Sequence, residues 1–419
     1  MSLRAAIILL LTIGCLPPAF AAPPTITYRL ESSGVFTGPE HGNLYPRYHF
    51  DDDDWNEVYL QEMRLFVKGK ASPQVGYRIE PRFQYTYADS AGEFDWTLDQ
   101  AYAYVDFSDK FSVTGGKQRI RWGTGMTFTP TDRWQPAANT LDPTRYLEGT
   151  YLFKADLFLP IASLTAVYTP SREHVEYRVD PDHVVGLRLY KLIGTLDIYL
   201  SATRSIYSRR GSINGRTSNY DEYETNYGAA FSWDSGPAVI YGEASHLKLT
   251  SGTIRHLLVP DVNTWQQRFV LGTSKQFNSS SSGYIEAYYN GWGLSHSDYK
   301  RLNKILGQLQ GFYGPYIENT PFADFVDQVM QLGSPARSLH QWYIALNGTY
   351  IYKETWGVTG NVIYEPVDNS CFVYPLLTYR GVENMDFMLG YSTVFGSSDG
   401  EKALMPAIHA VDFRFIVYF

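Results

Sequence analysis

Apolar and polar side chains alternate most clearly along residues 409–419, which read HAVDFRFIVYF. The apolar positions are Val411, Phe413, Phe415, Val417 and Phe419. The charged residues Asp412 and Arg414 fall on the opposite face. Because a strand points successive side chains to opposite sides, one face suits lipid and the other suits a polar interior. The pattern predicts a β-strand that crosses a membrane.

Weaker forms of this alternation along the chain predict eighteen strands. They are expected to begin near Thr27, Glu57, Gln74, Phe94, Phe111, Tyr151, Ser163, His183, Thr195, Asn226, Ala238, Arg268, Ser282, Leu339, Thr355, Phe372, Met385 and Ala407. Every second connection is short, and the intervening ones are generally longer, which is typical of transmembrane barrels and has no cause in a soluble sandwich. We therefore predict an all-β fold, a transmembrane antiparallel up-and-down β-barrel of about 18 strands with 16 as the alternative. Its short turns would be periplasmic and its long loops outside.

The N-terminal residues predict export. Arg4 precedes an apolar run over residues 5–13, and Ala19-Phe20-Ala21 is a small-x-small cleavage site. We expect a signal peptide over residues 1–21 and a single barrel domain over residues 22–419. The alternative is a lipoprotein signal cut before Cys15.

Composition agrees with a barrel. Aromatic residues make up 16% of the chain, including 34 Tyr and 9 Trp, and such rings favour membrane–water boundaries. The mean hydropathy of −0.26 is compatible with strands in which only alternate residues face lipid. A soluble, tyrosine-rich, carbohydrate-binding protein is the alternative. The net charge of −8 argues against nucleic-acid binding, and Cys371 alone would remain after processing, so no intramolecular disulfide is expected.

Charged residues at lumen-facing positions are the candidate pore lining. Lys117, Arg119 and Arg121 are expected to form one basic ladder facing the lumen, because each cation facing lipid would cost roughly 2–4 kcal/mol; Ile120 and Trp122 would lie on the other face. Further expected lumen charges are Arg78, Glu80, Arg82, Lys154, Asp156, Arg188, Asp197, Asp412 and Arg414. Charges of both signs either create a transverse field that selects solutes or pair and stiffen the lumen.

The connection over residues 122–149 is the candidate constriction. Its charged residues are Asp132, Arg133, Asp142, Arg145 and Glu148. We expect it to fold inward and narrow the pore, and the alternative is a cap on the outer rim. Barrels of about 16–18 strands leave an aqueous channel, so a pore follows from the strand count.

Two stretches resemble known outer-membrane barrels. Residues 116–143 contain Gly116-x-Gln118, Trp122-Gly123, a Thr-Pro-Thr-Asp stretch over residues 129–132 and a Leu-Asp-Pro stretch over residues 141–143. They are similar to a motif of Gram-negative porin-like families in which G-x-Q-x-x-x-W-G leads into a Pro/Asp-rich loop, although Thr129 and Leu141 depart from it. The C-terminal strand resembles the barrel-assembly signal of such proteins, which implies that role for Phe413, Phe415, Val417 and Phe419.

Three other features remain open. The four acids at residues 51–54 could bind divalent cations that bridge lipopolysaccharide or could simply be solvated. The connection over residues 291–338 shows two apolar repeats with helical spacing that could plug, cap or bind a partner. The nine histidines show no metal-ligand spacing, and no catalytic constellation is visible, so we expect no metal, no cofactor and no enzyme activity.

The preferred function is a porin-like channel for passive passage of small polar or anionic solutes through the outer membrane. The expected partners are lipid, lipopolysaccharide, the barrel-assembly machinery and the solutes themselves. One alternative is a barrel sleeve around multihaem cytochromes in an electron conduit. Another is an export channel for polysaccharide.

Overall fold

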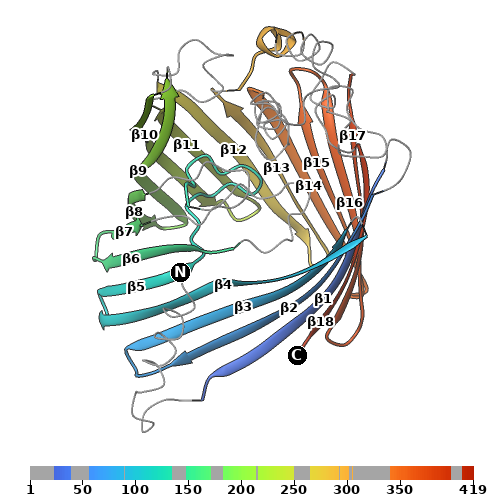
Figure 1. The fold of residues 1–419 in the computed structure, drawn as a ribbon, viewed down its shortest axis with the longest axis horizontal. Coiled ribbons are helices and arrows are strands. Elements are labelled where there is room, and N and C mark those ends of the chain that lie inside the picture. The colour runs from blue at the N-terminus through green and yellow to red at the C-terminus, as the bar shows by residue number, and fades with distance from the viewer. Residues whose placement is uncertain are drawn as a thin grey trace.

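The computed structural model describes residues 23–38, 56–88, 90–134, 148–170, 183–213, 216–249, 265–291, 293–301, 304, 340–397 and 408–419. These residues form eighteen β-strands (Figure 1). The strands are β1 (Thr25–Thr37), β2 (Asn56–Lys70), β3 (Val75–Ala88), β4 (Ala91–Ser108), β5 (Phe111–Gln118), β6 (Thr150–Phe158), β7 (Ser163–Thr169), β8 (His183–Ile193), β9 (Leu196–Ile213), β10 (Arg216–Asp234), β11 (Val239–Leu249), β12 (Trp265–Asn278), β13 (Ser281–Asn290), β14 (Trp342–Tyr352), β15 (Trp356–Glu365), β16 (Ser370–Val382), β17 (Met385–Phe395) and β18 (His409–Tyr418).

The strands form one closed antiparallel barrel. Each strand pairs with its neighbours in sequence, and β1 pairs with both β2 and β18. The closing ladder runs from Arg29 opposite Tyr418 to Thr37 opposite Ala410. Closure satisfies the backbone groups that an open sheet edge would leave unpaired. The predicted all-β, eighteen-stranded up-and-down barrel is confirmed.

Only one strand begins far from its predicted position. β10 begins at Arg216 rather than near Asn226, whereas every other strand begins within three residues of the prediction. Residues 216–225 read RTSNYDEYET and are polar on both faces, so they have no apolar stripe that alternation could detect. Backbone pairing with β9 across a two-residue connection extends the hairpin instead.

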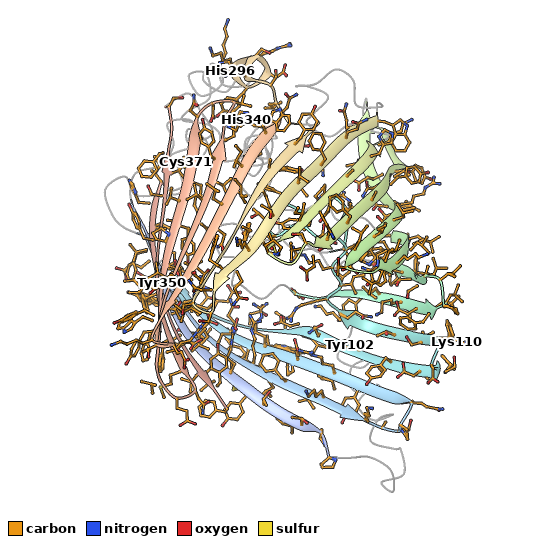
Figure 2. All side chains as sticks on the ribbon, turned by 180° about the vertical axis from the view of Figure 1, so that it is seen from behind. Tyr102, Lys110, His296, His340, Tyr350 and Cys371 are labelled. Carbon is orange, nitrogen blue, oxygen red and sulfur yellow. The ribbon has the colours of Figure 1, made fainter. Side chains whose placement is uncertain are left out.

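Short and long connections lie mainly at opposite ends of the barrel. At one end of the barrel, which we call the short-turn rim, eight connections of at most four residues join β2 to β3, β4 to β5 and so on to β16 and β17. The opposite end, the long-loop rim, carries the long connections, although those after β3, β9 and β15 are short. Figure 2 places His340 and Tyr350 toward opposite ends of β14. The predicted signal peptide, residues 51–54 and most of residues 291–338 (292, 302–303 and 305–338) lie outside the described residues.

The two faces of the wall differ in chemistry. On β8, Val185 and Leu187 are each 50% exposed, whereas Val184 between β7 and β9 is fully buried. On β18 and directly after it, Phe413 and Phe419 are exposed outward, while Asp412 and Ile416 are buried inside. This outward apolar face is the surface that lipid would cover. No helix within the described ranges is long and apolar enough to cross a membrane.

Candidate functional site

A loop enters the barrel after β5. The β5 ladder ends at Gln118, and residues 119–134 turn inward and follow the inner wall, as the turquoise segment of Figure 1 shows. The loop is described to Trp134 and again from Glu148. The inward position expected for this connection is therefore present in its described part, while Asp142 and Arg145 lie outside the described residues.

Two buried carboxylates on the far wall hold the loop. Glu243 on β11 accepts hydrogen bonds from the backbone N–H groups of Thr124, Gly125 (2.6 Å) and Thr131 (3.2 Å), and from the Thr131 hydroxyl at 2.7 Å. Glu243 is 3% exposed. Hydrogen bonds to an ionised acceptor are about twice as strong as neutral ones, so this carboxylate fixes three points of the loop at once.

Glu286 on β13 holds the tip of the loop in the same way. It accepts hydrogen bonds from the backbone N–H groups of Met126, Thr127 (2.9 Å) and Phe128 (3.2 Å). Glu286 is fully buried. Six loop N–H groups thus point at two wall carboxylates, which satisfies backbone donors that an irregular segment would otherwise leave without protein partners.

Aromatic side chains anchor both arms of the loop. Trp122 and Trp134 pack edge to face with ring centroids 5.0 Å apart, against Leu152, Val167 and Val184 on the inner face of β6 to β8. At the tip, the Phe128 ring stacks on Tyr288 of β13 at 4.5 Å and 8°. Trp134 has no exposed surface. Burial of these rings contributes apolar stabilisation beyond the hydrogen bonds.

Two glycines on the inner wall make room for the loop. A Cβ on Gly186 of β8 would lie 2.4 Å from Cζ2 of Trp134. A Cβ on Gly228 of β10 would lie 2.5 Å from the Ser201 hydroxyl and 2.9 Å from Cγ2 of Thr131. The wall is therefore shaped for the loop at positions where any larger side chain would displace it.

A cluster of paired charges lies on the wall from β1 to β5. Asp99 on β4 contacts Arg64 at 3.2 Å, Arg82 at 3.2 Å and Arg119 at 3.6 Å. The other contacts of the cluster are Arg29 with Glu31 and Glu62, Arg64 and Arg82 with Glu62, and Arg78 and Arg119 with Glu80. The loop contacts the wall from β6 to β14. The loop contacts and the charge cluster therefore lie on different parts of the barrel circumference.

The predicted basic ladder is wrong in its geometry. In the sheet, Lys117 stands opposite Ala101 and Tyr151, on the outward face that it shares with the exposed Phe153. It pairs with Glu148 and lies 5.2 Å from the Tyr151 ring. Arg119 turns inward only because the ladder has ended at Gln118. The prediction assumed that side chains alternate regularly through residues 117–121, and it therefore placed Lys117 on the wrong face of the barrel wall.

The expected orientation of Trp122 is wrong for the same reason. It belongs to the loop, not to the strand, and it packs inside the barrel. The other predicted charges that the structure describes lie on the inner wall or in the connection after β5. Arg133 pairs with Glu224, Lys154 with Asp156 at 2.9 Å, Arg414 with Asp412 at 3.3 Å, and Asp197 accepts the Tyr190 hydroxyl at 2.5 Å. Asp132 caps its own loop by accepting the Trp134 N–H at 2.9 Å.

Two cations beside the loop form no carboxylate ion pair within 4.0 Å among the described residues, although Asp156 and Asp132 lie near enough to attract Arg188. Arg188 on β8 lies over the rings of Trp122 (5.5 Å) and Tyr199 (5.6 Å), and its Nε makes no hydrogen bond. Arg121 donates to the Gly125 carbonyl. Their positive charges are thus less compensated than those of the paired cluster.

Sequence analysis missed the two carboxylates that hold the loop. Glu243 and Glu286 each occupy an inward position between lumen-facing aromatic or polar residues, such as Tyr241 and Ser245 around Glu243. An acidic residue at a lumen-facing position, with no cation opposite it on the neighbouring strands, indicates a partner from outside the sheet. This pattern could have identified both residues from the sequence. Their partners lie more than a hundred residues away in sequence, so no local pattern identifies them.

Known proteins resemble this chain in part. Residues 41–128 match the family described as phosphate-selective porin O and P. No curated protein matches the chain in sequence. Among solved structures, a triple mutant of Rhodopseudomonas blastica porin is 11% identical, over 95% of this chain and 100% of that one, with a TM-score of 0.44. Salmonella typhi OmpF in complex with daunomycin is 8% identical, over 94% and 97%, with a TM-score of 0.46.

The family match and the closed barrel agree with each other. The matched stretch includes Asp99, Arg119 and the loop up to Phe128, so it covers the charged wall and the entry of the loop. The chain is thus an eighteen-stranded antiparallel barrel, and residues 41–128 of it are similar to a porin family.

Proposed function

We propose that the barrel is a passive channel for small polar solutes with a preference for anions, narrowed by the loop over residues 122–134. The observation that carries the proposal is the set of six loop N–H groups donated to Glu243 and Glu286. A loop fixed at this depth reduces the open cross-section of a barrel whose strand number alone would leave a wide channel.

The passage runs between two surfaces of different character. The loop lies along β6 to β14, and the paired charge cluster around Asp99 lies on β1 to β5. A solute that passes between them exchanges water for fixed hydrogen-bonding groups and charges, which favours polar solutes over apolar ones.

Arg121 and Arg188 support the preference for anions. Both lie at the loop, and neither forms a carboxylate ion pair among the described residues. A guanidinium whose charge is not cancelled attracts anions and can hydrogen-bond phosphate or carboxylate oxygens with two N–H groups. The description of the matched family as phosphate-selective porins points the same way.

The sleeve alternative is less well supported. A barrel that encloses a multihaem cytochrome needs an unobstructed lumen, and the loop with its Trp122, Phe128 and Trp134 anchors takes up part of that space. The polysaccharide-export alternative assigns a gate to residues 291–338, most of which lie outside the described residues.

Purified barrel in planar bilayers tests the proposal. We expect a stable open conductance and, across a KCl gradient, a reversal potential of anion-selective sign. The R121E/R188E double variant should shift that potential toward cations, while K110E, at the short turn between β4 and β5, should shift it little. A barrel without open conductance refutes the channel. A reversal potential unchanged in R121E/R188E refutes the anion preference.

A further inference from the structure

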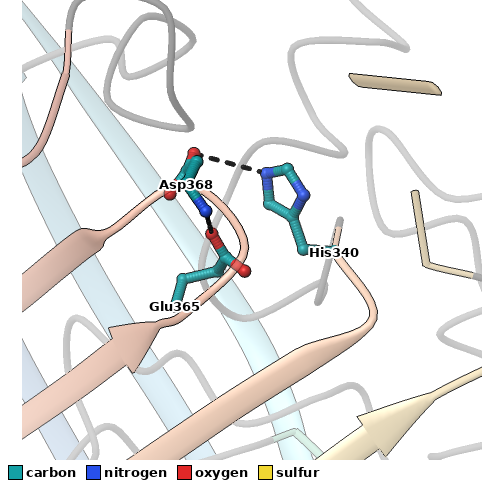
Figure 3. Close-up of side chains that lie close together, drawn as sticks. All are labelled: His340, Glu365 and Asp368. Atoms are coloured by element: carbon teal, nitrogen blue, oxygen red, sulfur yellow. Dashed lines mark hydrogen bonds and ion pairs between the residues drawn. The ribbon is translucent and has the colours of Figure 1, made fainter. Parts of the chain in front are cut away.

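Three buried ionisable side chains meet at the long-loop rim, away from the constriction loop. His340 precedes β14, Glu365 ends β15, and Asp368 lies in the turn between β15 and β16 (Figure 3). Their exposed fractions are 0%, 2% and 8%. None of them takes part in the proposed passage of solutes.

The spacing of the three groups suits a shared ion. One ligand atom from each residue lies within 4.8 Å of the others. His340 Nε2 and Asp368 Oδ2 are 3.5 Å apart. Two ligand atoms about 2.0–2.1 Å from a tetrahedral Zn²⁺ lie roughly 3.4 Å apart, so this pair already has the separation of two ligands on one ion.

The imidazole of His340 is buried and incompletely partnered. Among the described residues, Nδ1 has no hydrogen-bond partner and Nε2 has only the 3.5 Å contact with Asp368 Oδ2, although the ring has no exposed surface. The ring is held by packing, since Tyr299 lies edge-on at 4.5 Å, and by its own backbone N–H, which donates to the Tyr343 hydroxyl at 2.8 Å. A buried polar group without a partner is costly, and a metal ion would supply that partner.

The two carboxylates are oriented by backbone donors. Glu365 accepts the N–H groups of Val367 at 2.6 Å and Asp368 at 2.8 Å, and Asp368 accepts the N–H of Ser370 at 2.7 Å. Such outer contacts fix metal ligands in place and leave further lone pairs on each oxygen.

Two carboxylates and one imidazole face one another in this cluster. In the described part of the chain, Glu365 forms no ion pair with a lysine or arginine, and Asp368 Oδ2 lies 3.5 Å from His340 Nε2. Two adjacent buried carboxylates repel each other unless a proton or a cation lies between them.

We propose that His340, Glu365 and Asp368 bind a divalent transition-metal ion, with Zn²⁺ as the best match to one imidazole and two carboxylate ligands. Water would complete the coordination sphere. The bound ion ties the end of the long connection that precedes β14 to the turn between β15 and β16, so it fixes the place where that connection rejoins the wall. The site acts on the rim and not on the passage.

The full-length folded barrel, stripped with EDTA and titrated with Zn²⁺, tests the site. We expect one tightly bound Zn²⁺ per barrel by calorimetry and elemental analysis, and a thermal unfolding midpoint that rises with Zn²⁺ and falls again with EDTA. H340A and E365Q should each weaken binding at least tenfold. H183A removes a rim histidine outside the cluster and should keep full affinity.

Two results would overturn the proposal. One is a barrel that takes up no Zn²⁺ after stripping. The other is Zn²⁺ affinity unchanged in E365Q, a variant that keeps the size of the side chain and one of its two acceptor oxygens, and so decides the matter even where H340A does not fold. Single-channel conductance is expected to be equal with and without Zn²⁺, so the result is independent of the channel proposal.

Discussion

The Glu243 carboxylate on β11 accepts the Thr131 hydroxyl of the inward loop at 2.7 Å, across 112 positions of sequence. This contact and the neighbouring backbone hydrogen bonds to Glu243 attach the loop to the far wall, although the loop contains no strand. The depth of the loop is thus set by wall residues and not by the length of the connection.

Loss of the two loop-binding carboxylates should widen the channel. In E243Q/E286Q, each amide presents a donor to N–H groups that need an acceptor, and hydrogen bonds to charged groups contribute about 1.5–3 kcal/mol each. We expect a larger and noisier single-channel conductance, measured in planar bilayers. E354Q, in the turn between β14 and β15, should conduct like the wild type.

Deletion of residues 129–142 tests the same constriction by a different route. It removes the returning arm of the loop, including Thr131 and Trp134, and should raise conductance at least as much as E243Q/E286Q. If conductance in the deletion variant equals that of the wild type, the loop does not limit the channel.

Crowding the inner wall at Gly186 should displace the loop. A Cβ there would lie 2.4 Å from Trp134 Cζ2, and overpacking typically costs about 1–3 kcal/mol. We expect G186A to lower the thermal unfolding midpoint and to raise conductance. G348A on β14 adds a Cβ that meets nothing within 4 Å and should leave both unchanged. If G186A and G348A change the unfolding midpoint and the conductance equally, the effect does not come from contact between position 186 and the loop.

Neutralising Asp99 should favour anions. Its carboxylate lies within 3.6 Å of Arg64, Arg82 and Arg119, so D99N leaves three guanidinium groups with less compensation. Removing one member of a buried ion pair costs roughly 3–5 kcal/mol in a dry interior, and pore water should make the loss smaller. The reversal potential should move further toward anions, with D109N in the turn between β4 and β5 as control. A move toward cations would contradict the assignment of this cluster to the passage.

Alternation of apolar and polar residues predicted the barrel because successive side chains face lipid and lumen in turn, and lipid favours apolar side chains whereas the lumen favours polar ones. It worked for β18, where Phe413 and Asp412 point to opposite faces, and it failed at the start of β10, where both faces are polar. It also failed at Lys117 and Trp122, because the ladder ends at Gln118 and alternation has no meaning beyond that residue.

The site was only partly predictable. The inward loop could be expected from the motif at Trp122-Gly123, but Glu243 and Glu286 meet it through contacts that only the closed barrel creates. The cluster of His340, Glu365 and Asp368 shows why histidine spacing missed it. His340 is separated from Glu365 and Asp368 by the length of β14 and β15, and pairing of these two strands brings the three residues together.

Phe419 should contribute to assembly more than to the stability of the finished barrel. Its ring stacks on Tyr28 at 4.4 Å and 10°, and its backbone exchanges two hydrogen bonds with Tyr28, of 2.9 and 3.0 Å. F419A keeps those backbone bonds and loses a stacked pair worth about 0.5–1.5 kcal/mol beyond its buried area, so the folded barrel in detergent should lose only a little stability.

The matched control for this prediction is Y28A, which removes the same stack and leaves the C-terminal residue intact. If the terminal strand is the assembly signal that its sequence resembles, F419A should greatly reduce the amount of folded barrel in the outer-membrane fraction, measured as the heat-modifiable band in gels. Y28A should reduce it little. Equal losses in the two variants would assign the effect to the β1–β18 seam and not to recognition of the C-terminus.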